Sequence, residues 1–586
     1  MSPTSFVASS RAVSEMTYEK RAFLMLAFSL PLLLAHAFVP LRHFVHRSDD
    51  AYYYFKVAAQ FPVLGFWSFD GIHATNGVQP LWAMILSLIA TVLHWLGLRD
   101  PDLLARIFVA LAALLHYASA LVLFRLLART VSTGTAIAAA GALLFPVGIV
   151  WARVWGLENS LYALLLTATI SYFHLVFLPR ATPASALCFG LLLGLTFLAR
   201  LNAGFLVPCI LLYFLWADRD RPLRRRLGLA TLAAAPPALI LALYVVSNYL
   251  FTEHYLPVSG AAKAIWARQY LDAAGVETPL SRAFLSLLYY RFSGAVAWFL
   301  TSRALDGLWI AGSRVIFRED SGLPLERCIG ILALFVLLPA AFGRPREWLT
   351  FLRARLARLA PFSYVLAFGV LDAVVSVYLY AYQLRYSLTR WWFVENEIVI
   401  AVIVSTLAVA FMSYLIGPYV SGERRTMIVT AALGLYLVFH AQEMVRVFWS
   451  ERVEYHDWRL SWNDESYSGA RWLSENLPDD ALVGSWNAGV LGYYAKQRVV
   501  NLDGLINSFE LLPYLREKRV ADYIRKEGIQ YLSDLDMEFK KVRGQLALTE
   551  VYSHFSPFMQ QHYRIYKVDS VGSAVRGPVP GHAGSP

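Results

Sequence analysis

The stretch AFLMLAFSLPLLLAHAFVPLRHFVHRSDDAYYYFKVAAQF (residues 22–61) joins a long apolar run to a polar and aromatic segment. A helix needs about 20 apolar residues to cross the hydrocarbon core of a bilayer, and residues 22–41 provide them. Asp49 and Asp50 follow that run closely. The stretch therefore predicts a membrane-anchored chain that holds two adjacent acids at the membrane surface.

Apolar runs recur along most of the 586 residues. Hydrophobic residues make up 58% and charged residues 16% of the chain, against about 25% charged in an ordinary globular protein. This composition excludes a disordered chain, a collagen and a disulfide scaffold, and it predicts a polytopic α-helical membrane protein. The cysteines lie inside apolar stretches, without the spacing of a zinc site or of a disulfide framework. They are Cys188, Cys209 and Cys328.

The charge pattern predicts the topology. The chain has 52 Lys and Arg residues against 41 Asp and Glu, and the basic residues gather in short segments between apolar runs. This placement indicates the positive-inside rule rather than a nucleic-acid partner. The N-terminus is then cytoplasmic and the C-terminal region lies outside, after about 11 transmembrane helices. The expected spans are 22–41, 105–124, 134–151, 160–178, 184–199, 203–217, 227–249, 325–342, 362–382, 397–418 and 427–447.

One further apolar run, QPLWAMILSLIATVLHWLG (79–97), is also long enough to cross a membrane. If it crossed, the basic segment RDRPLRRR (219–226) would lie outside, against the strongest charge signal in the chain. We therefore predict that residues 79–97 lie in or near the outer leaflet, within a first external loop at 42–104. An ordinary span, with the topology corrected elsewhere, stays open as the alternative. A second external loop is expected at 248–324.

Residues 448–570 differ from the rest of the chain. Short apolar strands alternate there with helical segments, as in LVGSW, NAGVLGYYAKQ and RVVNLDG, which predicts a small α/β domain on the periplasmic or extracellular side. Residues 571–586 are rich in Gly and Pro and predict a disordered tail. The pattern GSWNAGVLG (484–492) is a poor match to a dinucleotide fingerprint. We expect a structural or acceptor-positioning domain, with the chemistry in residues 1–447.

The acid pair is the candidate catalytic group. Asp372 is the one clear acid deep in a predicted span, whereas ion-coupled transporters usually need several intramembrane ionisable residues. A site at the outer membrane surface is therefore favoured over a pathway through the membrane. We expect Asp49 to act as a general base, with Asp50 orienting it or helping to bind a metal. The alternative is that both acids only begin a helix, whose dipole they favour.

Polar residues on the other predicted outer loops complete the candidate site. Each cation alone is typical of an interfacial anchor, but together they suit the phosphate of a lipid headgroup that carries a sugar. The candidate phosphate- or lipid-binding residues are Lys263, Arg390, Arg200 and Arg268. The candidate substrate-binding residues are Asn76, Gln79, Glu158, His254 and Ser259. Lys263 is expected in a Gly/Ser-containing loop.

These motifs resemble the GT-C glycosyltransferases, mainly over residues 22–265. The likeness is closest to bacterial members with an acid pair before aromatic residues, a TNG-x-x-PLW segment, a GMET-like segment and a P-x-SG-x-x-K loop. The matching segments here are DDAY (49–52), TNGVQPLW (75–82), GLEN (156–159) and PVSGAAK (257–263). Two features depart from the family pattern: Asn159 replaces a Thr, and the acids are adjacent rather than Asp-x-Asp. A requirement for a divalent metal (Mg or Mn) therefore stays open, with Asp49 and Asp50 as its candidate ligands.

The resemblance implies an inverting enzyme of the cell envelope in the bacterial inner membrane. Such an enzyme transfers a hexosyl or pentosyl group from a polyprenyl-phosphate-sugar donor to a glycan, lipid or protein acceptor outside the cytoplasm. By motif, Asp49 matches the family's catalytic acid. Two other functions stay open: a lipid-linked sugar flippase or transporter, and a non-catalytic membrane scaffold with an outer binding domain. A transporter of this kind is expected to show an internal repeat, and the sequence contains none that we recognise.

Overall fold

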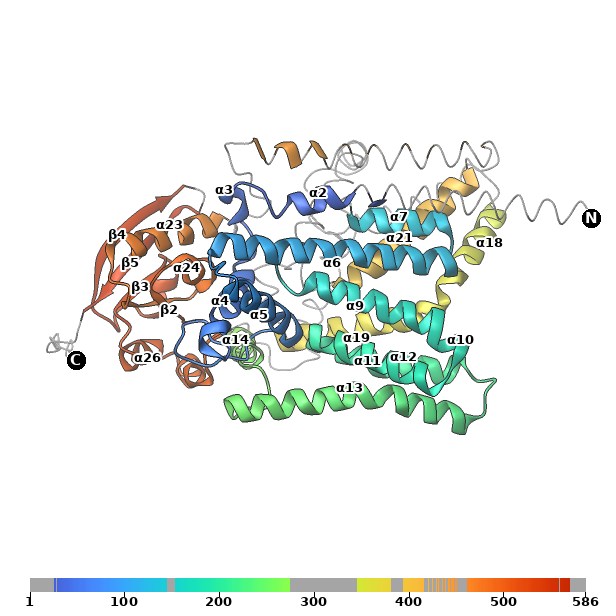
Figure 1. Cartoon of the computed structure of the whole chain (residues 1–586), viewed down its shortest axis with the longest axis horizontal. Helices are drawn as coiled ribbons and strands as arrows, with labels where there is room; N and C mark the ends of the chain where they lie inside the picture. Colours follow the sequence, from blue (N-terminus) through green and yellow to red (C-terminus); the bar gives the residue numbers. More distant parts are fainter. Residues whose placement is uncertain are drawn as a thin grey trace, which may run out of the picture.

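The computed structural model describes residues 26–27, 29–144, 153–273, 345–380 and 394–415, single positions between 420 and 449, and residues 461–557 and 559–569. These residues form a bundle of long helices with a mixed α/β domain at one end (Figure 1). The predicted span 325–342, more than half of the predicted span 427–447, Arg390 and the predicted tail 571–586 lie outside the described residues.

The bundle is that of a multi-pass membrane protein. Five of the described helical stretches are long and apolar enough to cross a membrane: Pro101–Thr130, Asn159–Arg180, Leu223–Thr252, Pro345–Asp372 and Val394–Tyr414. The helices of the bundle are α2 (Ser29–Ala35), α6 (Pro101–Thr130), α7 (Thr133–Leu144), α9 (Asn159–Tyr172), α10 (Leu178–Arg180), α11 (Pro183–Ala199), α12 (Leu206–Ala217), α13 (Leu223–Thr252), α18 (Pro345–Leu356), α19 (Ser363–Tyr380) and α21 (Val394–Leu415). Short apolar helices such as α11 and α12 complete the bundle.

Residues 41–95 form three helices at the end of the bundle that carries the C-terminal domain: α3 (Leu41–Phe44), α4 (Asp49–Leu64) and α5 (Pro80–Trp95). Helix α4 begins directly after Ser48, with both acids in its first turn, and ends where Gly65 adopts a φ of 74°. A left-handed residue of this kind ends a helix readily when it is glycine. Pro80 occupies the first turn of α5, a position where its missing N–H costs nothing.

The segments on both sides of α5 contact the C-terminal domain. Gly77 lies so close to this domain that a Cβ atom there would overlap the carbonyl oxygen of Leu505. On the other side, the carbonyl of Pro101 accepts a hydrogen bond of 2.6 Å from the Tyr493 hydroxyl. The α12–α13 connection and the start of α13, which together carry the basic segment 219–226, lie at the opposite end of the bundle (Figure 1). The segments before and after α5 therefore lie at the same end of the bundle, next to the C-terminal domain.

The second polar region is more helical than the sequence suggests. Helix α13 ends at Thr252, where Glu253 adopts a φ of 59°, and α14 (Val258–Ala273) follows after a short turn. Lys263 therefore lies on a helix, and its expected place in a loop is wrong. The reason is tertiary: the side-chain oxygen of Asn76 accepts the Val258 N–H at 2.8 Å, which satisfies a backbone donor at the start of α14.

The C-terminal domain contains one five-stranded sheet with the order β2-β1-β3-β5-β4. Strands β1 (Leu482–Ser485), β2 (Arg498–Asn501) and β3 (Tyr531–Leu535) are parallel, whereas β4 (Leu548–Ser556) and β5 (Gln561–Val568) continue the sheet antiparallel. Its helices are α23 (Ser461–Asn476), α24 (Ala488–Tyr494), α25 (Leu512–Arg516) and α26 (Val520–Lys526). The alternation of strands and helices is the one that the sequence pattern predicts.

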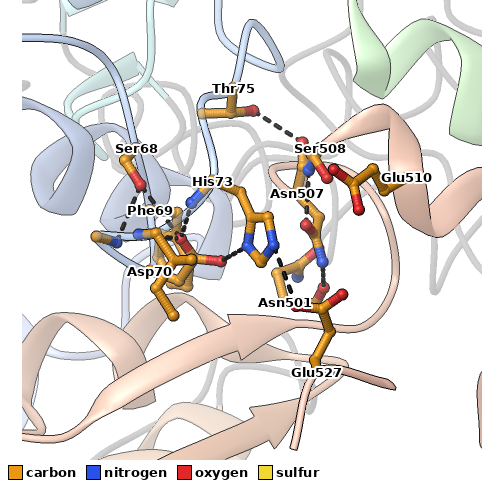
Figure 2. A network of polar contacts seen from close by, with 12 residues as sticks. Ser68, Phe69, Asp70, His73, Thr75, Asn501, Asn507, Ser508, Glu510 and Glu527 are labelled. Carbon is orange, nitrogen blue, oxygen red and sulfur yellow. Dashed lines mark hydrogen bonds and ion pairs between the residues drawn. The ribbon is translucent and has the colours of Figure 1, made fainter. Parts of the chain in front are cut away.

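A continuous interface joins this domain to the bundle. The buried apolar core that contains Tyr52 and Phe55 of α4 also contains Val490 and Leu491 of α24. Polar contacts surround this apolar contact. In Figure 2, the His73 ring lies between Asp70 of the first loop and Glu527 of the C-terminal domain, at 2.7 and 3.3 Å.

Candidate active site

A cavity of about 180 Å³ lies where α4, the start of α5, α14 and the C-terminal domain meet. Charged and polar side chains from sequence segments up to 213 residues apart (263 − 50) share this cavity with apolar ones. Its lining residues are Asp50, Tyr53, Tyr54, Gly77, Val78, Gln79, Leu157, Glu158, Arg200, Leu201, Asn202, Pro257, Ser259, Gly260, Lys263, Leu505 and Ile506.

Asp50 is the member of the acid pair that lines the cavity. It occupies the first turn of α4, and its charged neighbours are Lys263 and Glu158. Burial raises the pKa of the Asp50 carboxyl, and the nearby charge of Lys263 opposes this rise while that of Glu158 adds to it. A carboxylate with a raised pKa is a better proton acceptor than an exposed aspartate.

Lys263 provides positive charge on the α14 side of the cavity. Burial lowers the pKa of its ammonium group, while the carboxylates of Asp50 and Glu158 act in the opposite direction. A compact ammonium group in such a place suits a phosphate oxygen. The cavity therefore brings together a proton acceptor and an anion-binding group.

Asp49 does not line the cavity in the described structure. Its carboxylate instead accepts two backbone hydrogen bonds from the start of α24, from Gly489 N–H at 3.0 Å and Val490 N–H at 2.8 Å. Burial raises the pKa of this carboxyl to about 7, against the opposing effect of both amides. Both carboxylate oxygens of Asp49 thus accept hydrogen bonds from the C-terminal domain. The adjacent Asp50 lines the cavity instead.

A chain of hydrogen bonds fixes the part of the cavity lined by Tyr54, Gln79 and Glu158. The Tyr54 hydroxyl donates to Glu158 at 3.1 Å and accepts the Gln79 N–H at 3.0 Å. The side-chain oxygen of Gln79 in turn accepts the Leu201 N–H at 3.2 Å. Gly156, two residues before Glu158, adopts a φ of 99°, and a Cβ atom there would overlap the ring of Phe55. The turn that presents Glu158 therefore requires glycine.

Arg200 reaches the cavity from the end of α11. Its guanidinium donates to the Asn159 side-chain oxygen at 3.3 Å and lies 5.5 Å from the centre of the Tyr162 ring. Asn159 is the residue that departs from the GMET-like pattern, and here it serves as a hydrogen-bond acceptor for the arginine. Ser259 also lines the cavity, next to the start of α14.

Other residues predicted for the site lie elsewhere. The buried Asn76 side chain connects the first loop to α13 and α14, through Asn248 at 3.2 Å and Val258 at 2.8 Å. The His254 ring stacks on Phe509 of the C-terminal domain, with 3.8 Å between ring centres. Arg268 is exposed on α14 and does not line the cavity. Asn76 and His254 thus connect structural elements around the cavity instead of lining it.

The C-terminal domain also contributes to the cavity wall, although the side chains predicted to carry the chemistry all lie within residues 1–447. Leu505 and Ile506, from the turn after β2, form part of its lining. Asp503 in the same turn is an electrostatic neighbour of Asp50, and burial raises the pKa of its carboxyl to about 8. Leu505 and Ile506 are apolar residues in the segment NLDGLIN, and nothing in that segment predicts a functional site. Only the docking of the domain on Gly77 brings them there.

Among the residues that the structure describes, no group of three or more His, Cys, Asp and Glu side chains is arranged to hold a metal ion. Asp50 and Glu158 are the two carboxylates on the cavity. Mg²⁺ is commonly held by one or two carboxylates together with substrate phosphate and water. Two carboxylates on one cavity fit that kind of site.

Comparisons with known proteins agree with this architecture. Residues 455–573 match a family described as a domain of unknown function, and no curated protein matches the chain. The oligosaccharyltransferase AglB from Archaeoglobus fulgidus, in complex with an inhibitory peptide and a dolichol-phosphate, superimposes with a TM-score of 0.52 at 12% identity. The match covers 95% of this chain and 75% of that one. The apo form of the same enzyme gives a TM-score of 0.51 at 13% identity, covering 92% and 74%.

This chain has the GT-C fold. The likeness to the GT-C enzymes extends past residue 265, where the motifs end, because the match to AglB spans nearly the whole chain. ArnT from Cupriavidus metallidurans is also similar, with a TM-score of 0.42, 15% identity and coverage of 93% and 97%. At such low identity the similarity to these structures shows the fold alone, and the evidence for the chemistry comes from the residues of the cavity.

Proposed function

We propose that this GT-C protein transfers a sugar from a polyprenyl-phosphate-linked donor to an acceptor hydroxyl, on the membrane face that carries the C-terminal domain. That face corresponds to the periplasmic side of a bacterial inner membrane. The observation that carries the proposal is the pairing of Asp50 with Lys263 across one cavity at the end of the membrane bundle. The AglB structure, which contains a dolichol-phosphate, supports a lipid-linked donor for this fold.

Asp50 takes the role of general base in this proposal. The sequence favours Asp49, but the two backbone amides of α24 already occupy its oxygens. Asp50 faces the cavity and has a raised pKa. Asp49 then acts through the C-terminal domain, which it holds against α4.

The transfer step is a single displacement with Asp50 as the base. The acceptor oxygen attacks the anomeric carbon while Asp50 takes its proton. The bond between the anomeric carbon and the phosphate oxygen breaks, and its electron pair leaves with the phosphate. The products are the glycosylated acceptor and a polyprenyl monophosphate. Attack from the face opposite the leaving group inverts the configuration at the anomeric carbon.

Positive charge stabilises the leaving phosphate as its negative charge develops. Lys263 and Arg200 both line the cavity and are the cations that we assign to this phosphate. Gln79, Glu158 and Ser259 are the polar wall available to the sugar and the acceptor. If the reaction uses Mg²⁺ or Mn²⁺, Asp50 and Glu158 would hold the ion, which would supply further positive charge to the phosphate.

The test compares Asp50→Asn with the same substitution at another acid at a helix start. Purified protein is supplied with a panel of polyprenyl-phosphate sugars, and release of polyprenyl monophosphate is measured. Loss of a general base lowers the rate by about 10²–10⁴-fold, so Asp50→Asn should be folded and nearly inactive. Asp100→Asn is the control, because Asp100 caps α6 through the Leu103 N–H at 2.7 Å and Asn caps nearly as well.

The outcomes separate the candidate functions. Inactive Asp49→Asn together with active Asp50→Asn would return the base to Asp49. Wild-type protein that releases no lipid phosphate from any donor, but moves a lipid-linked sugar between leaflets of a vesicle, would favour a flippase. Activity that disappears in a chelator and returns with Mg²⁺ or Mn²⁺ would establish the metal, and full activity in the chelator would exclude it.

A further inference from the structure

Two buried acids of the membrane bundle lie behind Arg200. Asp372 on α19 is 1% exposed and Glu395 at the start of α21 is fully buried. Both are electrostatic neighbours of Arg200. We propose that Asp372 and Glu395 are positioning residues that hold the Arg200 guanidinium in the orientation needed to bind the donor phosphate. This inference rests on the proposed function and extends its site into α19 and α21.

The contacts join these acids to the cavity surface. The Asn202 side chain, which lines the cavity, donates to Asp372 at 2.6 Å. Glu395 is a neighbour of Asp372 and of the Tyr162 hydroxyl, and the Tyr162 ring lies under Arg200. Arg200 therefore lies among Glu158, Asn159, Tyr162 and the two acids, and it also lines the cavity.

Asp372 and Glu395 are buried in the membrane bundle, where acids require compensating partners. A buried ionisable side chain destabilises the fold unless a partner compensates its charge, and such residues in membrane proteins usually mark functional sites. A second acid at the same helix start, Glu397, forms an ion pair with the buried Arg153, which accounts for that residue. Glu395 is an electrostatic neighbour of both Arg153 and Arg200, and Asp372 is a neighbour of Arg200. Unlike Arg153, Arg200 also lines the cavity.

Orientation matters for an arginine that binds phosphate. The guanidinium is a planar fork that binds phosphate oxygens in pairs, so its plane has to face the ligand. A long free side chain would lose rotamer freedom on binding. Acids that hold the fork beforehand remove this cost from the binding step.

The positioning role and a simple charge-balance role predict opposite effects on phosphate binding. If Asp372 and Glu395 only neutralised excess positive charge, replacing either acid with its amide would make the cavity more positive and strengthen phosphate binding. If they position Arg200, the same replacement weakens binding although the net charge becomes more favourable. The sign of the change therefore distinguishes the two roles.

The experiment measures binding of farnesyl phosphate, a short polyprenyl monophosphate, to the purified full-length protein in detergent, with farnesol as the phosphate-free reference. Asp372→Asn and Glu395→Gln should each weaken farnesyl phosphate binding about tenfold, equivalent to one charge-assisted hydrogen bond, and leave farnesol binding unchanged. Glu397→Gln is the matched control. It breaks a buried ion pair on the same helix and should lower thermal stability without changing farnesyl phosphate affinity.

A double-mutant cycle tests whether the acids act through Arg200. In an Arg200→Lys background, Asp372→Asn should change affinity little further, because the fork that it holds is gone. Unchanged or tighter binding in both single acid variants would overturn the inference while leaving the proposed function intact. Wild-type protein that binds farnesyl phosphate no better than farnesol would overturn the proposed donor class, and this inference with it.

Discussion

The carboxylate of Asp49 accepts the backbone N–H of Val490 at 2.8 Å, across 441 residues of sequence. The adjacent Gly489 N–H binds the other oxygen of the same group. The next residue, Asp50, faces the cavity instead. One step along the start of α4 thus separates a contact that holds the C-terminal domain from the group that we assign to catalysis.

Asp49→Ala should loosen the C-terminal domain. The substitution leaves two buried amides at the start of α24 without their acceptor, which costs about 1–3 kcal/mol for each unsatisfied group. We expect faster amide hydrogen exchange over residues 486–494 and a lower rate of transfer, because Leu505 and Ile506 are part of the cavity wall.

Gly489→Ala tests the same contact from the other side, because its Cβ atom would overlap the backbone of Asp49. It should reproduce the exchange pattern of Asp49→Ala, whereas Asp480→Ala, at an exposed position, should not. Normal protection of α24 in both Asp49→Ala and Gly489→Ala would show that apolar packing alone docks the domain.

The transfer rate should depend on pH with two limbs. Activity needs ionised Asp50 and protonated Lys263. Burial raises the pKa of Asp50 and lowers that of Lys263. The acidic limb of kcat/KM should therefore lie at a higher pH than the usual aspartate pKa of about 4. The alkaline limb should lie at a lower pH than the usual lysine pKa of about 10.4. Lys263→Arg should move the alkaline limb upward, since arginine stays protonated. An acidic limb at the ordinary aspartate pKa would contradict the role of Asp50.

The His73 contact should make domain docking sensitive to pH. Its hydrogen bond to Asp70 raises the pKa of the His73 imidazole, burial opposes this, and the charges of Asp70, Glu527 and Glu510 add to the rise. Lys526 pairs with Glu510 and Glu527 and moderates their charge. A raised folded-state pKa gives stabilisation that is complete below the ordinary pKa of about 6.5 and is lost as pH rises through the folded-state value.

Hydrogen exchange of α26 between pH 5.5 and 8.5, corrected for its intrinsic pH dependence, measures this effect. Protection should fall with rising pH in the wild type and change little in His73→Gln. His562→Gln, at a half-buried histidine of β5 that bonds Ser553 instead of the interface, should keep the wild-type dependence. Equal pH dependence in His73→Gln and the wild type would contradict the prediction.

Residues 99 and 224 should lie on opposite sides of the membrane. Arg99 and Arg224 are exposed, the first between α5 and α6 and the second at the start of α13. Single cysteines at these positions, in a chain without Cys188, Cys209 and Cys328, should react with an impermeant thiol reagent from different sides. Reaction from the same side would mean that α5 crosses the membrane.

The sequence alone indicates the membrane class, the acid pair and the GT-C resemblance, because each depends on local information. Hydrophobic length identifies membrane helices, and the short motifs around Asp49, Thr75 and Lys263 are contiguous. The in-plane prediction for residues 79–97 also follows from the sequence, because charge in one loop constrains the direction of every span that follows it.

Only the tertiary structure decides which acid faces the cavity. The side chains of successive residues in a helix point about 100° apart, so Asp49 and Asp50 cannot share one partner surface. Which of them meets α24 depends on where a domain more than 400 residues later docks. The same docking brings Leu505 to the cavity, and bundle packing places Asp372 and Glu395 behind Arg200. Such long-range contacts leave no periodic or local pattern in the sequence from which they could be predicted.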